Sequence, residues 1–175
     1  MQTNGLLMIF TGNGKGKTTA AVGLALRAAG HGFPVLFLQF MKGQRHIGEI
    51  LAFKRNPLPI HFRQYGRPGF VQSRACEPLD VYLAHQALEA CRTQMAAGAY
   101  QMIVLDEINV AVDFGLLRVD EVLAVLKMRP SNLHLVLTGR NAPPAFMDLA
   151  DLVTEMKEIK HPYQKKIRAQ KGIEF

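Results

Sequence analysis

Short apolar runs recur along the chain and are separated by amphipathic or polar segments. Runs of five or six residues with little polar alternation, such as Val35 to Phe40, are typical of parallel strands covered on both faces. The predicted strands are 6–10, 35–40, 60–65, 102–105, 133–137 and 152–156.

Helical periodicity fills most of the intervals between these runs. The segment 17–30 is apolar nearly all round, which predicts burial against a sheet rather than a surface position. Gly66 to Val71 contains two glycines and a proline and is therefore predicted to be a loop. The predicted helices are 17–30, 78–98, 119–126 and 145–150, with a short amphipathic piece at 49–54. Strands that alternate with helices predict one α/β domain over residues 1–175, with an open, mostly parallel sheet and helices on both faces.

Composition limits the classes of protein to consider. The chain has 175 residues, 49% of them hydrophobic and 20% charged, which fits one domain with a sizeable core. No apolar run approaches the roughly 20 residues of a membrane helix, and Met1 to Gly5 lacks the basic region of an export signal. Cys76 and Cys91 form no metal-type pair, and the histidines are scattered. Reduced thiols in a cytoplasmic protein are the simplest interpretation.

Positive charge gathers near the C-terminus. The formal net charge is +7, and residues 157–171 contain six basic residues and a single acidic one, Glu158. Such a run is most often a solvated face, whereas the functional alternatives are nucleic acid, an acidic protein partner or a polyphosphate. Only Tyr163 lies among these charges, so a stacking platform for nucleic acid is not expected.

A glycine-rich loop joins the first predicted strand to the first predicted helix. It runs from Gly12 to Thr19 and contains Gly-Lys-Thr-Thr where the helix begins. Backbone N–H groups at such a junction converge on one point, Lys17 can reach outer phosphates, and the Thr18 hydroxyl can bind Mg²⁺. A nucleoside triphosphate is therefore the expected ligand. The first glycine comes one place later than in the usual pattern, and a turn without a ligand is the less favoured alternative.

Asp106 and Glu107 follow the most hydrophobic predicted strand, as in a Walker-B element. At the same sheet edge as the loop, they are expected to bind Mg²⁺ or Mn²⁺ together with Thr18. Together with the loop they predict a P-loop NTPase-like (RecA-like) fold, although a strand end that caps a turn is the plain alternative. Arg140 follows another strand at this edge, where it is expected to meet a phosphate, the Asp106 cluster or a structural partner.

Several motifs together resemble the ATP:cob(I)alamin adenosyltransferases of the CobA/CobO/BtuR type, including the shifted glycine pattern. The resemblance covers nearly the whole chain and is carried by Thr11–Ala21, Arg27–Gly32, Val104–Asn109, Leu137–Arg140, Ala150–Met156, Lys160–Tyr163 and Ala169–Phe175. It implies an enzyme that transfers the 5′-deoxyadenosyl group of ATP to the cobalt of reduced cob(I)alamin or another corrinoid and releases triphosphate. Cobalt(I) is itself the nucleophile in that reaction. The protein therefore needs no general base and acts by positioning and electrostatics.

The resemblance also implies roles for particular residues. Lys17 and Thr18 would stabilise the leaving triphosphate, and Phe70 would press on the lower face of the corrinoid, since the chain has no Trp. Phe70 as a loop anchor, and Arg27 as a structural ion pair rather than a nucleotide ligand, are the alternatives. The implied ATP-binding residues are Gly12, Asn13, Gly14, Lys15, Gly16, Lys17, Thr18, Thr19 and Arg27.

The partners implied are ATP, a corrinoid and a second copy of the chain in a homodimer. The implied reaction belongs to the biosynthesis or salvage of adenosylcobalamin. A reducing flavoprotein with an acidic surface is expected to dock on the basic tail. Two other function classes stay open at this point. One is an ATPase or nucleotide-dependent switch in which Glu107 polarises water, and the other is a nucleotide-binding module without chemistry.

Overall fold

Six parallel strands form one open sheet in the computed structural model, which describes residues 4–43, 47–68 and 76–174. The strand order is β3-β2-β4-β5-β1-β6, and every pairing is parallel. The strands are β1 Leu7–Thr11, β2 Val35–Phe40, β3 Ile60–Tyr65, β4 Met102–Asp106, β5 His134–Thr138 and β6 Leu152–Glu155. The strands and the predicted fold class are confirmed.

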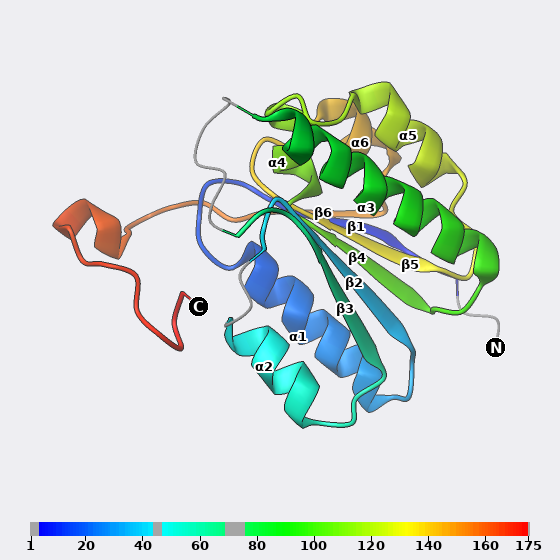
Figure 1. Cartoon of the computed structure of the whole chain (residues 1–175), viewed down its shortest axis with the longest axis horizontal. Helices are drawn as coiled ribbons and strands as arrows, with labels where there is room; N and C mark the ends of the chain where they lie inside the picture. Colours follow the sequence, from blue (N-terminus) through cyan, green and yellow to red (C-terminus); the bar gives the residue numbers. More distant parts are fainter. Residues whose placement is uncertain (1–3, 44–46, 69–75, 175) are drawn as a thin grey trace.

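Helices cover both faces of the sheet (Figure 1). They are α1 Lys17–Gly30, α2 Gly48–Arg55, α3 Pro78–Ala97, α4 Ile108–Asp113, α5 Val119–Lys127 and α6 Pro144–Leu149, followed by the 3₁₀ turn η1 Pro162–Lys165. Alternate strand residues enter two cores, because successive side chains of a strand point to opposite faces. Phe37 and Val104 pack on the side of α1, and Leu36 and Leu105 pack on the side of α3. None of the helices in the described part of the chain has the length and apolar character that crossing a bilayer requires.

The expected packing of α1 against the sheet is confirmed, but the helix also has an exposed face, and one further helix was not predicted. Helix α1 buries only one face, with Ala21, Ala25 and Ala28 against the sheet, and Leu26 on the other face is 50% exposed. Alanine occurs on both buried and exposed faces of helices, so the sequence of an alanine-rich helix does not show which face is buried. Helix α4 was not predicted, because six residues are too few for a helical period to be recognised.

The parallel strands bring their carboxyl ends to one edge of the sheet. In the strand register Gln39 pairs with Asp106, and Leu105 pairs with Leu137, so Thr138, the last residue of β5, lies at the level of Asp106. Helix α1 starts at this edge, directly after the glycine loop that follows β1. The open sheet therefore gathers polar residues from four strands around one helix N-terminus, which is where ligands bind in such folds.

Candidate active site at the carboxyl edge of the sheet

The glycine loop is shaped by the chain segment that follows β6. Gly12 and Gly16 have φ values of 91° and 121°, which L-residues with a side chain rarely adopt. A Cβ atom at Gly12 or Gly14 would lie 2.5 or 2.8 Å from the carbonyl oxygen of Met156. The Gly14 N–H donates to that oxygen at 2.6 Å. The close approach of Met156 thus explains why glycines stand at 12 and 14 in the shifted pattern.

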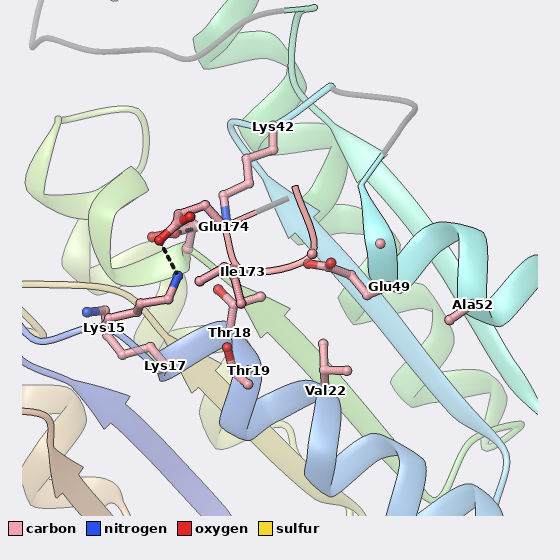
Figure 2. A pocket seen from close by; sticks show the side chains of 14 residues that line it. Lys15, Lys17, Thr18, Thr19, Val22, Lys42, Glu49, Ala52, Ile173 and Glu174 are labelled. Atoms are coloured by element: carbon pink, nitrogen blue, oxygen red, sulfur yellow. Dashed lines mark ion pairs between the residues drawn. The ribbon is translucent and has the colours of Figure 1, made fainter. Parts of the chain in front are cut away.

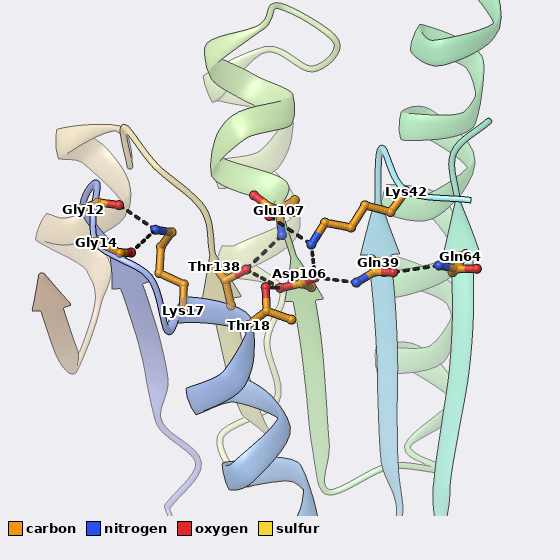
Figure 3. A network of polar contacts seen from close by, with 10 residues as sticks. All are labelled: Gly12, Gly14, Lys17, Thr18, Gln39, Lys42, Gln64, Asp106, Glu107 and Thr138. Carbon is orange, nitrogen blue, oxygen red and sulfur yellow. Dashed lines mark hydrogen bonds and ion pairs between the residues drawn. The ribbon is translucent and has the colours of Figure 1, made fainter. Parts of the chain in front are cut away.

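Lys17 folds back over the loop that precedes it. Its Nζ donates to the carbonyl oxygens of Gly12 and Gly14, both at 2.7 Å (Figure 3). Burial, and then the charge of Arg140, lower the pKa of Lys17. The carbonyls of Gly12 and Gly14 are both neutral, so an anionic ligand could replace them at little electrostatic cost.

Asp106 is the centre of a buried polar network at the end of β4. Its side chain is fully buried and accepts hydrogen bonds from Thr138 Oγ1 at 2.6 Å, Thr18 Oγ1 at 2.8 Å and Gln39 Nε2 at 2.8 Å. Gln64 Nε2 donates in turn to Gln39 Oε1 at 2.8 Å. These bonds compensate the carboxylate for its loss of water and fix it beside the first turn of α1.

Glu107 adopts a left-handed backbone conformation with φ 65°. Its N–H donates to Thr138 Oγ1 at 2.9 Å, while the same hydroxyl donates to Asp106. A non-glycine residue in this region is strained and is held there by its surroundings. Glu107 lines the cavity described below, so this carboxylate lies next to the cavity in a backbone conformation that its surroundings maintain.

Lys42 follows β2 and completes the network. Its Nζ lies 3.4 Å from Asp106 Oδ2 and 3.1 Å from Glu107 Oε1 (Figure 3). Burial acts to lower the pKa of Lys42, but the charges and hydrogen bonds of Asp106 and Glu107 outweigh burial and raise that pKa well above its usual value. Lys42 therefore keeps its positive charge between the two carboxylates.

An open cavity of about 480 Å³ lies over the start of α1. One side is formed by Lys15 to Thr19, Lys42 and Glu107, and the other by α2 and the C-terminal residues Gly172 to Glu174. Figure 1 shows the tail leaving β6, turning at η1 and returning toward the start of α1. Lys15 Nζ and Glu174 Oε1 lie 3.6 Å apart where the tail meets the loop (Figure 2). The tail therefore supplies part of the wall of this cavity.

The structure brings Lys15, Gly16, Lys17, Thr18, Thr19 and Glu107 to this cavity, with Asp106 directly behind them. Gly12 and Gly14 shape the loop through Met156 and Lys17, and Asn13 is exposed between them. Arg27 is exposed in the last turn of α1, about 15 Å along the helix from Lys17, and does not line the cavity. The contact of Arg27 with the nucleotide stays a prediction. Phe70 lies outside the described residues.

Four members of the network were not recognised from the sequence, namely Gln39, Gln64, Thr138 and Lys42. Gln39 interrupts an otherwise apolar buried strand, and this pattern could have marked it as a functional position. Thr138 is recognisable from the sequence only as the end of a strand, although its hydroxyl joins Asp106 to the backbone of Glu107. Lys42 lies in a polar loop sequence that carries no recognisable signal.

Comparison with known proteins adds an independent finding. The family model described as "ATP:corrinoid adenosyltransferase BtuR/CobO/CobP" matches residues 3–175. A corrinoid adenosyltransferase of Pseudomonas aeruginosa is 40% identical over 171 residues, which are 98% of this chain and 84% of that protein. The corrinoid adenosyltransferase CobA of Salmonella typhimurium is 35% identical over 176 residues, covering 99% of this chain and 87% of that protein.

Solved structures with a similar fold are more distant in sequence. The flagellar accessory protein FlaH of Methanocaldococcus jannaschii has a TM-score of 0.57 at 14% identity, covering 87% of this chain and 71% of that one. The KaiC-like protein PH0186 of Pyrococcus horikoshii has a TM-score of 0.51 at 18% identity, covering 90% of this chain and 75% of that one. These similarities concern the P-loop NTPase-like fold alone.

Proposed function

The chain belongs to the ATP:corrinoid adenosyltransferase family BtuR/CobO/CobP, and from this membership we propose how its residues divide the work of the reaction. The enzyme transfers the 5′-deoxyadenosyl group of ATP to a reduced corrinoid in cobalamin biosynthesis. Cobalt(I) of the corrinoid substrate supplies the electron pair that forms the bond to C5′. The C5′–O bond breaks, and its electron pair leaves with triphosphate. No proton transfer is required at the reacting carbon, so the protein must position two substrates and stabilise a leaving anion.

We propose that the loop from Lys15 to Thr19 binds the triphosphate. The backbone N–H groups at the start of α1 and the ammonium groups of Lys15 and Lys17 offer positive potential in one cavity. The Gly14 N–H is already bonded to the Met156 carbonyl, so Gly12 and Gly14 are assigned to shaping the loop rather than to donating. On nucleotide binding, Lys17 Nζ would exchange its two carbonyl partners for phosphate oxygens, which form stronger charge-assisted bonds.

The residues at the end of β4 fit a divalent cation. Thr18, Asp106 and Glu107 offer only oxygen ligands, which Mg²⁺ and Mn²⁺ prefer, and they already meet in one network. An ammonium group stands between the two carboxylates, which shows that this place accepts positive charge. We propose that Thr18 and Glu107 hold the cation with Asp106 behind them. When bound there, the cation would neutralise charge that develops on the triphosphate.

Four further assignments rest on the family or on the composition of the chain rather than on the geometry of the site. We propose that residues 1–175 act as one domain, that the protein forms a homodimer in the cytoplasm, and that Phe70 contacts the lower corrinoid face. We also propose that an acidic flavoprotein docks on the basic tail, whose residues Lys165, Lys166 and Arg168 are exposed. Neutralising these three charges should weaken reductase-coupled turnover at low salt, and an unchanged rate would exclude this docking site.

The observation that carries the residue assignment is the convergence of Lys17, Thr18, Asp106 and Glu107 at one cavity. Product analysis of the purified chain tests it. Triphosphate should appear only when ATP and a chemically reduced corrinoid are both present, and Lys17→Met should abolish its formation. Release of ADP and phosphate without corrinoid would instead support an ATPase or switch, which the similarity to adenosyltransferases does not favour.

A further inference from the structure

We propose that Lys42 is an internal counter-cation for the two acidic residues of the site, and that it makes binding of a divalent metal depend on the nucleotide. Without nucleotide, its ammonium occupies the space between the carboxylates of Asp106 and Glu107. With nucleotide, the ammonium turns to the polyphosphate and leaves the carboxylates to the metal. This inference rests on the metal site proposed above.

The position of Lys42 Nζ supports this role. It lies 3.4 Å from Asp106 Oδ2 and 3.1 Å from Glu107 Oε1, and the Lys42 side chain is 18% exposed. Asp106 is fully buried, whereas Lys42 and Glu107 both line the cavity. The ammonium therefore stands on the cavity side of the buried carboxylate, where an incoming cation and an incoming phosphate would both meet it (Figure 3).

The backbone around Lys42 is tightly held, while its side chain is long and flexible. The Met41 N–H donates to the Tyr65 carbonyl at 3.0 Å, and Met41 has a φ of 60°. A Cβ atom on Gly66 would lie 2.3 Å from the backbone N of Lys42, so β2 and β3 end in direct backbone contact. Four methylene groups separate this fixed backbone from Nζ. The ammonium can therefore move between carboxylate and phosphate without any change in the fold.

Charge balance explains why the metal would wait for the nucleotide. Asp106 and Glu107 carry two negative charges, and Lys42 already cancels one of them. Lys17 adds positive charge to the same cavity, whereas Lys15 is paired with Glu174. The Thr18 hydroxyl is bonded to Asp106. A divalent cation that enters without nucleotide would be repelled by the Lys42 ammonium, and this repulsion is strong because the carboxylates lie where water is partly excluded. The triphosphate brings enough negative charge for both cations, so metal and nucleotide favour each other's binding.

Binding of Mn²⁺ alone to the full-length protein tests this role. Titrations followed by electron paramagnetic resonance should show weak binding to the wild type. Lys42→Met should bind Mn²⁺ about ten-fold more tightly or better, because the competing charge is gone. Lys42→Arg keeps that charge and should resemble the wild type. Lys15→Met removes a charge from the same cavity without touching the acidic pair, and should change this affinity by less than about two-fold.

Two further arms locate the effect. The double variant Lys42→Met with Glu107→Gln should lose the gained affinity, because one of the two carboxylates no longer carries charge. Addition of ATP without corrinoid should tighten Mn²⁺ binding to the wild type. Thermal unfolding checks that each variant is folded, and Lys42→Gln replaces the Met variant if that one is not.

Each outcome has a defined meaning. An unchanged affinity in Lys42→Met, or an equal gain in Lys15→Met, overturns the role of Lys42 while the ATP-dependent gain still supports the metal site. If ATP fails to tighten Mn²⁺ binding to the wild type, the metal site proposed for this family member fails as well, and the role of Lys42 fails with it.

Discussion

The two sides of the nucleotide cavity are built in different ways. On the sheet side, Asp106 is fully buried and bonded by Thr18, Gln39 and Thr138, which belong to three different elements or their ends. On the tail side, Gly172 to Glu174 are exposed and approach the loop through an ion pair between Lys15 and Glu174 at 3.6 Å. An exposed ion pair of this kind contributes about 0–1 kcal/mol, whereas a buried network resists any change in its members.

This contrast separates two tasks of the site. The buried network on the sheet side suits the role proposed for it, because electrostatic stabilisation of a leaving group requires charged groups held in one geometry. The tail side is held weakly enough to be displaced by a ligand that carries more charge than one carboxylate. The following changes act on the two sides, from the strongest expected effect to the weakest.

Asp106→Asn should give the largest loss. The amide cannot accept hydrogen bonds at all the positions now occupied by Thr18, Thr138 and Gln39, and it removes one of the two charges that face Lys42. We expect adenosyl transfer to fall by about 100-fold or more and the free energy of unfolding to fall by about 2–4 kcal/mol. Urea unfolding and single-turnover assays measure the two effects. Asp148→Asn on the exposed surface of α6 serves as control, and equal losses there would contradict the assignment.

Thr138→Val should be the next most severe change on the sheet side. It removes the donor to Asp106 and the acceptor for the Glu107 N–H, and leaves that N–H without its partner in a strained turn. We expect a loss of about 1–3 kcal/mol in the free energy of unfolding and a lower kcat with little change in the KM for ATP. Thr138→Ser keeps the hydroxyl and should recover most of both. A Ser variant as poor as Val would show that the methyl group matters more than the network.

The ion pair between Arg67 and Asp80 lies on neither side of the cavity, and it should make the stability of the fold depend on pH. Arg67, just after β3, makes a two-pronged contact with Asp80 in α3 at 2.8 Å for both bonds, and this contact lowers the pKa of Asp80. On acidification, Asp80 is therefore protonated in the unfolded chain at a higher pH than in the folded protein. The contact stabilises the fold fully above about pH 4–5, and this stabilisation is lost as the pH falls below the ordinary pKa of an aspartate and through the lowered pKa of Asp80. Urea unfolding from pH 7 to pH 2.5 should show the wild type and Asp80→Asn converging in acid. Parallel curves would mean that Asp80 does not titrate with folding.

Glu174→Gln should have the smallest effect and should act on the tail side only. The variant frees Lys15 from its anionic partner, so the KM for ATP should fall by less than about three-fold while the free energy of unfolding stays the same. Steady-state assays at low and high salt measure the difference, which should vanish at high salt. Glu158→Gln, another tail carboxylate that accepts from Gln164, is the matched control. A large loss of stability in Glu174→Gln would place the tail with the rigid side instead.

What the sequence could predict follows from the range of each interaction. The strands were recognisable because their apolar runs are continuous, and the glycine loop because its chemistry is local to a few residues. The contacts of Lys42 and Gln39 with Asp106 depend on the pairing of β2 with β4, which joins residues more than 60 positions apart. Lys42 leaves no local pattern, and the only local sign of Gln39 is one polar residue in an apolar strand. The return of the tail over the cavity was also beyond prediction, since its polar sequence has no period that would direct it to a partner.

The bond from the Gly14 N–H to the Met156 carbonyl has one more consequence. It ties the start of the tail to the phosphate loop itself, so Glu174 is tethered 18 positions beyond a fixed point on the site that it contacts. A group on so short a tether has an effective concentration on the order of millimolar at the loop, whatever the protein concentration. At the proposed triphosphate site, ATP would therefore compete with an anion that belongs to the same chain.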